Sequence, residues 1–314
     1  MRILFMGTPD FAVPSLEALI DKGYNVIGVV TQPDRPKGRK QLLTPPPVKL
    51  IAEKHNIPVY QPEKVSDEEH INIFRQLQID LIITAAFGQL LSNELLSIPK
   101  LGCINIHASI LPKYRGGAPI HWAVINGEVE TGVTIMYMEE KLDAGAIIAQ
   151  QIVPISFLDT TGKVYEKVMN AGAELIIDTL PSIISADIQA VPQDHTKATF
   201  AYNIRRSDEL INWGKSSIEI YNQIRGLAPW PGAYTTQDGQ ILKIWESEII
   251  TEQIEGIHDL KNGTVYRLTK QGPLVITGNG CIVLKEVQPA GKKAISGFDY
   301  VNSGKITEGM IFGC

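Results

Sequence analysis

The first half of the sequence alternates between short apolar segments and longer segments with helical periodicity, and this alternation constrains the fold more than any other feature. Residues 2–7 (RILFMG) and 25–32 (NVIGVVTQ) have the composition of strands, and residues 11–23 (FAVPSLEALIDKG) have the apolar spacing of an amphipathic helix. A strand, a helix and a second strand of these lengths form a parallel pair joined by a crossover. The pattern continues to about residue 185 and predicts an α/β fold with an open, doubly wound, mostly parallel sheet.

Beyond this region the periodicity changes. A polar connector and one helical segment are followed by short strand-like runs separated by turn residues. Asp238 and Gly239 lie between two alternating runs, a pattern typical of a tight hairpin. The second half therefore predicts a smaller, OB-like β-barrel. The predicted divisions are a first domain at 1–188, a linker at 189–205 and the β-barrel domain at 206–314.

Composition excludes several classes of protein. The 314 residues are 44% hydrophobic and 20% charged, as in ordinary globular proteins, and no segment approaches the roughly 20 apolar residues that span a membrane. The N-terminal sequence reaches Gly, Pro and Asp before any apolar run is long enough for a signal peptide, so we expect a cytoplasmic protein. The three cysteines lie far apart, and no Cys/His spacing is typical of zinc, so we expect no metal.

The net charge of −5 gives no overall attraction to nucleic acid, but one stretch is strongly basic. Residues 34–49 (DRPKGRKQLLTPPPVK) contain one acidic side chain and five basic ones: Arg35, Lys37, Arg39, Lys40 and Lys49. Such a loop is either solvated surface or a mobile segment that follows phosphates with Gly38 as a hinge. Its length and its run of prolines favour binding.

Two common nucleotide-binding motifs are absent. The turn after the first strand, GTPDFAVPS, has no GxGxxG pattern, and no GxxxxGK[ST] occurs anywhere in the chain. Pro9 and Phe11 occupy positions where a dinucleotide loop needs small residues. We interpret this segment as a strand-to-helix turn, with Thr8 or Asp10 as the N-cap.

Residues 102–110 (GCINIHASI) alternate apolar and polar positions, which places Asn105, His107 and Ser109 on one face of a strand. A central strand of a doubly wound sheet is normally apolar on both faces, because helices cover both. Ligands of such sheets bind beyond the carboxyl ends of strands. Asp143, in a turn between two later strands, could reach the same edge of the sheet.

An Asn, a His and an Asp together suit attack on a carbonyl carbon. The amide can donate to the developing oxyanion, the imidazole can transfer a proton, and the carboxylate can orient the imidazole. Each residue also has a structural interpretation: His107 as a satisfied core residue, and Asp143 as part of an Asx-type turn. Ser109 is interpreted as structural, because no base remains for it and the GxSxG motif is absent.

At these residues the sequence resembles the folate-dependent formyltransferases. Their motif combines Asn-x-His, a Ser-Leu-Leu-Pro-like run and a downstream Gly-Val-Thr…Leu-Asp-x-Gly segment, and here Ile110 replaces the usual first Leu. The resemblance also covers GTPDFAVPSLEAL, TQPDRPKGRK, YRGGAPI, RGLAPWPGAY and VQPAGKKA, so it extends over essentially the whole chain. Gly117 and His121 depart from the usual Ala and Gln, away from the three proposed catalytic residues.

The resemblance implies transfer of a formyl group from 10-formyltetrahydrofolate to the α-amino group of methionine on initiator tRNA, by a monomer without a metal. The implied catalytic residues are Asn105, His107 and Asp143. The folate-binding residues are expected to be Ala86, Phe87, Gly88, Gln89, Ser109, Leu111 and Pro112. The residues expected to bind initiator methionyl-tRNA are Arg35, Lys37, Arg39, Lys40, Lys292 and Lys293, with Arg39 matched to the family's key arginine.

Three other interpretations keep the catalytic residues. A formyltransferase acting on a sugar amine or a purine precursor, or a formyl-folate hydrolase, would need no basic loop, so residues 34–49 and the matches in the second half count against both. A degenerate binding module that only holds folate or RNA is a different class of protein. The intact Asn105, His107 and Asp143 argue against it, because a retired site has no reason to keep all three roles together.

Overall fold

The structure, a computed structural model, describes residues 1–38, 41–250 and 260–313. The chain separates into two compact units that are discontinuous in sequence. Unit 1 contains Met1–Pro119, Glu130–Pro154 and Tyr165–Tyr202, and unit 2 contains Ile120–Val129, Ile155–Val164 and Asn203–Cys314. These units differ from the continuous divisions expected at residues 188 and 206, because two segments from the first half pack with the second unit.

Most of the expected linker also belongs to unit 1. Val191 exchanges backbone hydrogen bonds with Ile147, each 2.8 Å long, and Phe200 forms a parallel bridge with Arg115. The polar composition predicted a connector, but these long-range backbone pairings attach it to the first unit.

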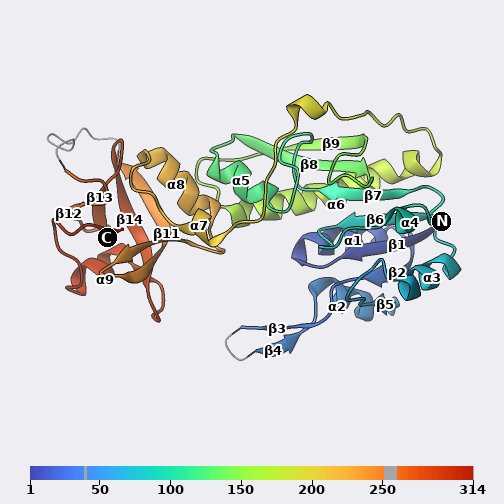
Figure 1. Ribbon diagram of the computed structural model, residues 1–314, viewed down its shortest axis with the longest axis horizontal. Helices are drawn as coiled ribbons and strands as arrows, with labels where there is room; N and C mark the ends of the chain where they lie inside the picture. The colour runs from blue at the N-terminus through green and yellow to red at the C-terminus, as the bar shows by residue number, and fades with distance from the viewer. Residues whose placement is uncertain (39–40, 251–259, 314) are drawn as a thin grey trace. The chain divides into compact units, whose positions relative to one another are not determined.

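Unit 1 is built on a seven-stranded sheet with the order β5-β2-β1-β6-β7-β8-β9 (Figure 1). The strands from β5 to β7 are parallel, and β8 and β9 continue the sheet in antiparallel pairs. The predicted doubly wound, mostly parallel sheet is therefore confirmed. The strands are β1 (Arg2–Gly7), β2 (Asn25–Val30), β5 (Val59–Tyr60), β6 (Leu81–Ala85), β7 (Cys103–His107), β8 (Glu130–Tyr137) and β9 (Ile147–Pro154).

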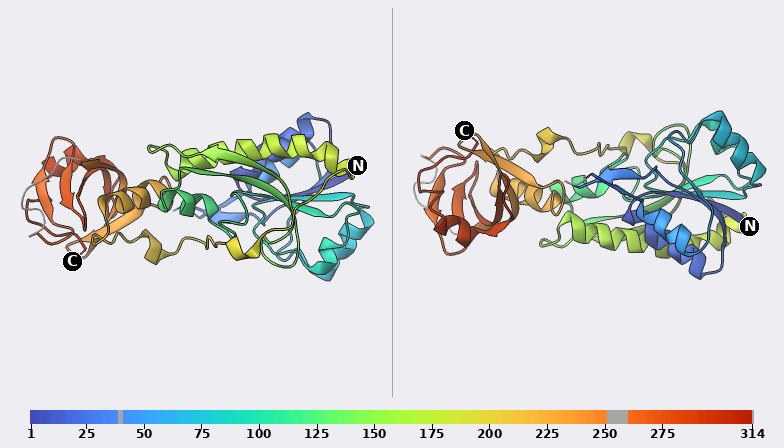
Figure 2. Two further views of the ribbon diagram at one scale, coloured as in Figure 1. Left: turned by 90° about the horizontal axis from the view of Figure 1, so that it is seen from above. Right: turned by 90° about the horizontal axis from the view of Figure 1, so that it is seen from below.

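Helices cover both faces of this sheet. Helices α1, α2 and α6 lie on one face, and α3 and α4 lie on the other (Figure 2). Helix α6 packs closely on β7, since a Cβ added to Gly172 would lie 3.0 Å from the Ile106 side chain. The helices are α1 (Val13–Asp21), α2 (Pro47–Lys54), α3 (Glu68–Gln76), α4 (Asn93–Leu96) and α6 (Thr161–Ile184), with a short 3₁₀ turn η1 (Asp10–Ala12) before α1 and another, η2 (His195–Lys197), near the end of the unit.

This packing explains the polar face of β7. Ile104 and Ile106 are almost fully buried, and Ile106 lies against α6. Because side chains alternate along a strand, Asn105 and His107 are on the opposite face from Ile106. The apolar side chains of β7 thus pack in the core, and its polar side chains are available for a site at the end of the sheet.

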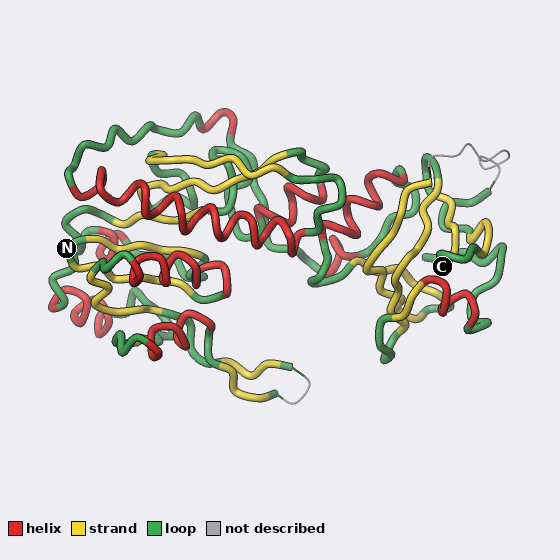
Figure 3. Tube along the Cα trace, turned by 180° about the vertical axis from the view of Figure 1, so that it is seen from behind, coloured by secondary structure: helices red, strands yellow, loops and turns green. Residues whose placement is uncertain are grey.

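Two short strands form within the basic loop, and its last residues begin helix α2. Strands β3 (Arg35–Lys37) and β4 (Leu42–Thr44) pair antiparallel, as Figure 3 shows. We expected a loop without strands there, so the two paired strands are a correction, and their physical reason is the backbone ladder between them. The expected mobility of this segment stays a prediction. Gly38 follows β3 with a φ of +71°, a conformation that glycine adopts without a steric penalty.

Unit 2 contains a six-stranded antiparallel sheet with the order β10-β11-β14-β13-β12 and with β15 paired to β14. Asp238 and Gly239 connect β10 to β11 with φ of +49° and +71°, which confirms the predicted hairpin. The strand pairs within the described residues do not join β10 to β12, so closure into a barrel stays a prediction. The strands are β10 (Ala233–Gln237), β11 (Gln240–Ile250), β12 (Val265–Leu268), β13 (Pro273–Ile276), β14 (Cys281–Pro289) and β15 (Ile295–Ser296).

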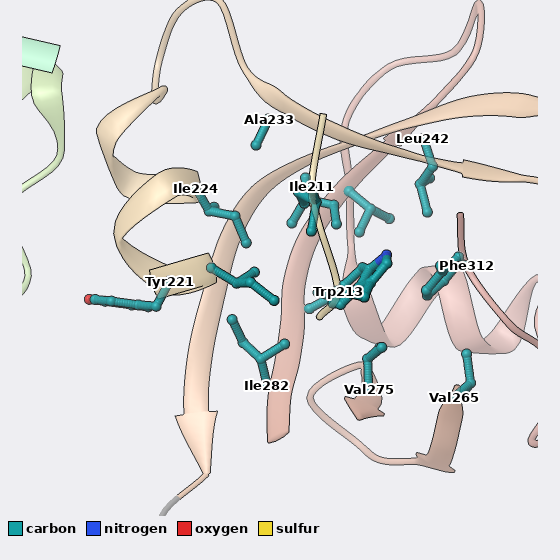
Figure 4. Close-up of a cluster of buried hydrophobic side chains, with 14 of the residues drawn as sticks. Ile211, Trp213, Tyr221, Ile224, Ala233, Leu242, Val265, Val275, Ile282 and Phe312 are labelled. Carbon is teal, nitrogen blue, oxygen red and sulfur yellow. The ribbon is translucent and has the colours of Figure 1, made fainter. Parts of the chain in front are cut away.

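The core of unit 2 lies between this sheet and helix α8 (Figure 4). Ile220 and Ile224 of α8 are buried there, and the rings of Trp213 and Phe312 stack with their centroids 5.8 Å apart. Ser216 caps α8, since its hydroxyl accepts the Glu219 N–H in a capping box. The helices of unit 2 are α5 (Pro119–Ile125), α7 (Arg206–Glu209), α8 (Ser217–Gly226) and α9 (Gly297–Asn302), and the first turn of α6 also belongs to this unit.

Within the part of the chain that the structure describes, none of the helices has the length and hydropathy needed to span a bilayer.

Candidate active site

Asn105 lies at the end of β7 beside Thr84 of the neighbouring strand β6. The Thr84 hydroxyl donates to Asn105 Oδ1 over 2.7 Å. Thr84 is 2% exposed, so water competes little for this bond. With its oxygen held from inside the protein, the Asn105 amide presents its NH₂ group as a donor.

His107 is 6% exposed, and each ring nitrogen faces a protein oxygen. Nε2 lies 3.0 Å from the Tyr114 carbonyl oxygen. Because a carbonyl can only accept, Nε2 carries a proton and donates it. Nδ1 lies 3.6 Å from Oδ2 of Asp143.

Asp143 lies in the turn between β8 and β9 with a φ of +48°, a region that side-chain-bearing residues seldom occupy. Its Oδ2 accepts the backbone N–H of Gly116 over 2.8 Å. Since the same oxygen faces His107, this hydrogen bond fixes the carboxylate toward the imidazole. The structure thus brings His107 and Asp143 together, with Asn105 two positions earlier on the same face of β7.

One tripeptide, Tyr114 to Gly116, contacts both members of the His107–Asp143 pair. Its first residue supplies the carbonyl that His107 binds, and its third supplies the N–H that Asp143 binds. Gly116 has a φ of +117°, and a Cβ there would lie 2.8 Å from the Ala201 carbonyl oxygen. A side chain at this position would therefore disturb the turn that contacts His107 and Asp143.

Two buried residues that the sequence interpretation missed complete the surroundings of Asp143. Arg115 is 5% exposed and Gln193 is 6% exposed, and the guanidinium donates to Gln193 Oε1. The Gln193 amide in turn donates to the backbone carbonyls of Asp143 and Gly145. Arg115 belongs to the quoted YRGGAPI segment and could have been noticed, whereas nothing in the polar connector distinguished Gln193.

The predicted folate-binding loop follows β6. Ala86 and Gly88 are exposed, with φ of +45° and +87°. The Phe87 carbonyl is already engaged, because it accepts from the Thr8 hydroxyl (3.0 Å) and the Gln32 amide (3.1 Å). Thr8 or Asp10 was expected as an N-cap, but the N-cap positions of η1 and α1 are Pro9 and Ala12. Thr8 instead holds this loop.

The other predicted folate-binding residues make contacts within the protein. Gln89 Oε1 accepts the backbone N–H of Val65 over 2.7 Å. Ser109 is fully buried, and its hydroxyl donates to the Lys113 carbonyl over 2.7 Å. Leu111 is 2% exposed, and Pro112 is partly exposed. Their contact with folate stays a prediction.

The predicted tRNA-binding residues lie in two separate segments. In strand β3, exposed Arg35 pairs with Glu63, and Lys37 is exposed. Lys292 and Lys293 are exposed in the turn after β14. Arg39 and Lys40 lie outside the described residues.

Cys103, also on β7, is not a nucleophile. Its side chain is 3% exposed, and burial raises the pKa of its thiol to about 12. At neutral pH the reactive thiolate is therefore negligible. Among the residues that the structure describes, no group of three or more His, Cys, Asp or Glu side chains is placed to hold a metal ion.

The fold and this cluster of residues define a formyl transferase. Residues 1–180 match the family described as formyl transferase, and residues 203–305 match the formyl transferase C-terminal domain. The chain is 53% identical to a methionyl-tRNA formyltransferase of Bacillus velezensis, over 99% of this chain and 98% of the relative. It is 54% identical to one from Staphylococcus aureus, over 98% of this chain and 97% of the relative. The chain belongs to the methionyl-tRNA formyltransferase family.

More distant solved structures share the fold. An N-formyltransferase from Helicobacter canadensis, in complex with folinic acid and dTDP-3-aminofucose, has a TM-score of 0.67 at 22% identity, covering 92% of this chain and 99% of its own. HypX from Aquifex aeolicus, in complex with tetrahydrofolic acid, has a TM-score of 0.64 at 17% identity, covering 96% of this chain and 47% of its own.

Proposed function

We propose that this protein transfers the formyl group of 10-formyltetrahydrofolate to the α-amino group of methionine on initiator tRNA. The observation that carries the proposal is the convergence of Asn105, His107 and Asp143 at the end of β7. The chain that holds them is similar over 99% of its length to a methionyl-tRNA formyltransferase.

The reaction begins when the deprotonated methionyl amine attacks the formyl carbon. A carbon–nitrogen bond forms, and the formyl oxygen takes the electron pair of its double bond and becomes an oxyanion. The Asn105 NH₂, oriented by Thr84, donates to that oxyanion. When the oxygen re-forms its double bond, the bond to N10 of the folate breaks; N10 takes a proton, and the new amide nitrogen releases one.

His107 is held in this scheme by contacts on both ring nitrogens. Nε2 donates to the Tyr114 carbonyl and Nδ1 faces the Asp143 carboxylate, so the ring is fixed at the end of the strand where the oxyanion develops. The direct proton transfer expected from the sequence requires one ring nitrogen to leave its present partner. The proposed role of His107 is therefore to stabilise the oxyanion first and to move a proton second.

The tRNA partner is proposed to contact hairpin β3–β4 and the turn after β14. Arg35 forms an ion pair with Glu63 in which both side chains are more than half exposed, so exchanging the carboxylate for a phosphate costs little. Lys37 adds a second exposed cation, and Lys292 and Lys293 add the other patch. We further propose that the protein acts as a monomer in the cytosol, which light scattering during size-exclusion chromatography and cell fractionation would test.

The experiment measures transfer of labelled formyl from 10-formyltetrahydrofolate. The acceptors are charged initiator methionyl-tRNA, charged elongator methionyl-tRNA, free methionine and a sugar amine. Strong preference for the initiator tRNA supports the proposal. Transfer to the sugar amine alone would show that the acceptor is a sugar amine and not tRNA. No transfer to any acceptor would favour a binding module.

A matched pair of lysines tests the tRNA surface. Lys37→Ala in β3 should raise the KM for tRNA about threefold to tenfold and leave the KM for folate unchanged, since one phosphate contact is lost. Lys22→Ala, at the end of α1, removes the same charge from another exposed position of unit 1. Equal effects of both variants would mean that β3 has no special role.

A further inference from the structure

Asp143 needs support beyond its bond to Gly116. Its left-handed backbone conformation is intrinsically unfavourable for a residue with a Cβ, so contacts elsewhere must hold the turn. The Gly116 N–H restrains only the carboxylate. The backbone from which that carboxylate extends is restrained by Gln193.

The Gln193 amide binds the turn on both sides of Ala144. Nε2 donates to the Asp143 carbonyl over 2.9 Å and to the Gly145 carbonyl over 2.8 Å. An amide NH₂ has two hydrogens, so each carbonyl receives one. A Cβ at Gly145 would lie 1.9 Å from the Tyr137 carbonyl oxygen, so the turn has little room to shift in that direction.

Arg115 determines which way this amide points. Gln193 Oε1 accepts from Nε (3.2 Å) and from Nη2 (2.6 Å) of the guanidinium. Because a guanidinium only donates, a flipped amide would place NH₂ against N–H groups, and both carbonyls would lose their donors. Both side chains are about 95% buried, so water cannot easily replace these bonds.

We infer that Gln193 and Arg115 are positioning residues that hold the Asp143 carboxylate against His107. This inference rests on the proposed function for its catalytic consequence. Gln193 fixes the Asp143 backbone, and Arg115 fixes Gln193. Arg115 also lies between Tyr114 and Gly116, the two residues that bind His107 and Asp143.

The first test is Gln193→Glu. Glutamate keeps the size and an oxygen for Arg115, but it removes both N–H donors and places negative charge against two carbonyls. We expect kcat to fall about 10- to 100-fold, since a displaced catalytic group costs rates of this order, while both KM values change less than about threefold. Arg115→Lys keeps a donor for Gln193 and should retain more kcat than Arg115→Met.

Gln223 of unit 2 offers a matched control. It is 7% exposed, and its Nε2 also donates to two backbone carbonyls, those of Asp208 (2.8 Å) and Leu210 (3.1 Å). Gln223→Glu makes the same chemical change in another buried network. It should lower thermal stability and leave kcat of the folded protein unchanged.

A double-mutant cycle separates positioning from general damage. If Gln193 acts through Asp143, then Gln193→Glu in an Asp143→Asn background should lower kcat less than twofold further, because the carboxylate that it positions is already gone. A full 10- to 100-fold further loss would overturn the inference, as would normal kcat in Gln193→Glu.

A readout without catalysis completes the test. The Gly116 amide reports the carboxylate position directly, so its hydrogen exchange should accelerate at least tenfold in Gln193→Glu and Arg115→Met but not in Gln223→Glu. Unchanged Gly116 exchange in folded Arg115→Met and Gln193→Glu would refute positioning. If the wild-type protein transfers no formyl group, the proposed function fails, and Gly116 exchange still decides whether these residues hold Asp143.

Discussion

Two buried arginines, Arg115 in unit 1 and Arg225 in unit 2, use the same side chain for different purposes. Arg115 donates to the side chains of Gln193 and His195. Arg225 donates to Asn222 Oδ1 and to the backbone carbonyl of Asp159 over 2.9 Å. Arg115 thus supports the side chain that holds the Asp143 turn, whereas Arg225 joins α8 to residues 155–164 through a backbone carbonyl.

The second role explains why unit 2 is discontinuous. Helix α8 carries Arg225, and Tyr221 one turn earlier donates its hydroxyl to the Phe157 carbonyl over 3.0 Å. The Phe157 and Tyr221 rings stack with centroids 4.8 Å apart. These contacts attach residues 155–164 to α8. Burial lowers the pKa of the Arg225 guanidinium from its ordinary value, as desolvation disfavours the charge.

The largest expected effect is a loss of kcat, and it is tested by substituting one asparagine in each unit. Asn105→Ala removes the proposed oxyanion donor and should lower kcat about 10²- to 10³-fold, with the free energy of unfolding nearly unchanged. Single-turnover formyl transfer and urea unfolding measure the two quantities. Asn222→Ala, which removes the acceptor of Arg225, should do the reverse. A kcat loss in both variants would show that unit 2 takes part in chemistry.

The next effect concerns the arginine of unit 2. Arg225→Met leaves the buried Asp159 carbonyl without its donor and should lower the free energy of unfolding by about 2–3 kcal/mol. Urea titration monitored by tryptophan fluorescence measures this loss. The kcat of the folded fraction should remain within about twofold of wild type. A variant with normal stability would contradict the role given to Arg225.

A smaller effect is expected from a pair of buried threonines. Thr84→Val keeps the shape but frees Asn105 to rotate, so kcat should fall about tenfold, close to one lost hydrogen bond. Thr235→Val in unit 2 removes the acceptor of the Trp213 indole N–H instead. It should reduce stability alone. Steady-state kinetics and thermal unfolding of both variants distinguish the two roles.

The smallest expected effect is a pH-dependent loss of stability that arises from a buried cysteine in each unit. Burial raises the pKa of Cys103 to about 12 in unit 1 and that of Cys281 to about 11 in unit 2, from 9.0 when unfolded. These groups stay protonated in the folded state while the unfolded thiols ionise, so stability present below pH 9 is lost as pH rises. From pH 7 to pH 9 the two thiols together should cost about 0.8 kcal/mol.

Urea unfolding at both pH values measures this loss. Cys103→Ala and Cys281→Ala should each remove about half of it, because each unit contributes one buried thiol among the described residues. If one variant removed all of the pH-dependent loss, only one of the two thiols would contribute to it, and the prediction of equal contributions would be wrong.

Local patterns in the sequence predicted much of the fold and the positions of three residues of the candidate site. Period-two alternation put Asn105 and His107 on one face of β7, and Asp238-Gly239 gave the hairpin of unit 2. The approach of Asp143 to His107 followed from a rule about the ends of parallel strands. Each of these inferences depends on neighbours in sequence or on a general property of such sheets.

Only the tertiary structure decided what holds those residues in place. Gln193 is 50 positions from Asp143 and 78 from Arg115 in sequence, and it lies in a polar segment with no periodicity. The attachment of residues 155–164 to α8 is equally remote. Alternation and turn chemistry are properties of short segments, so the sequence by itself determined which residues share a face or a turn. Hydrogen bonds between distant segments depend on the geometry of the whole fold, so only the folded chain showed which buried side chain supports Asp143.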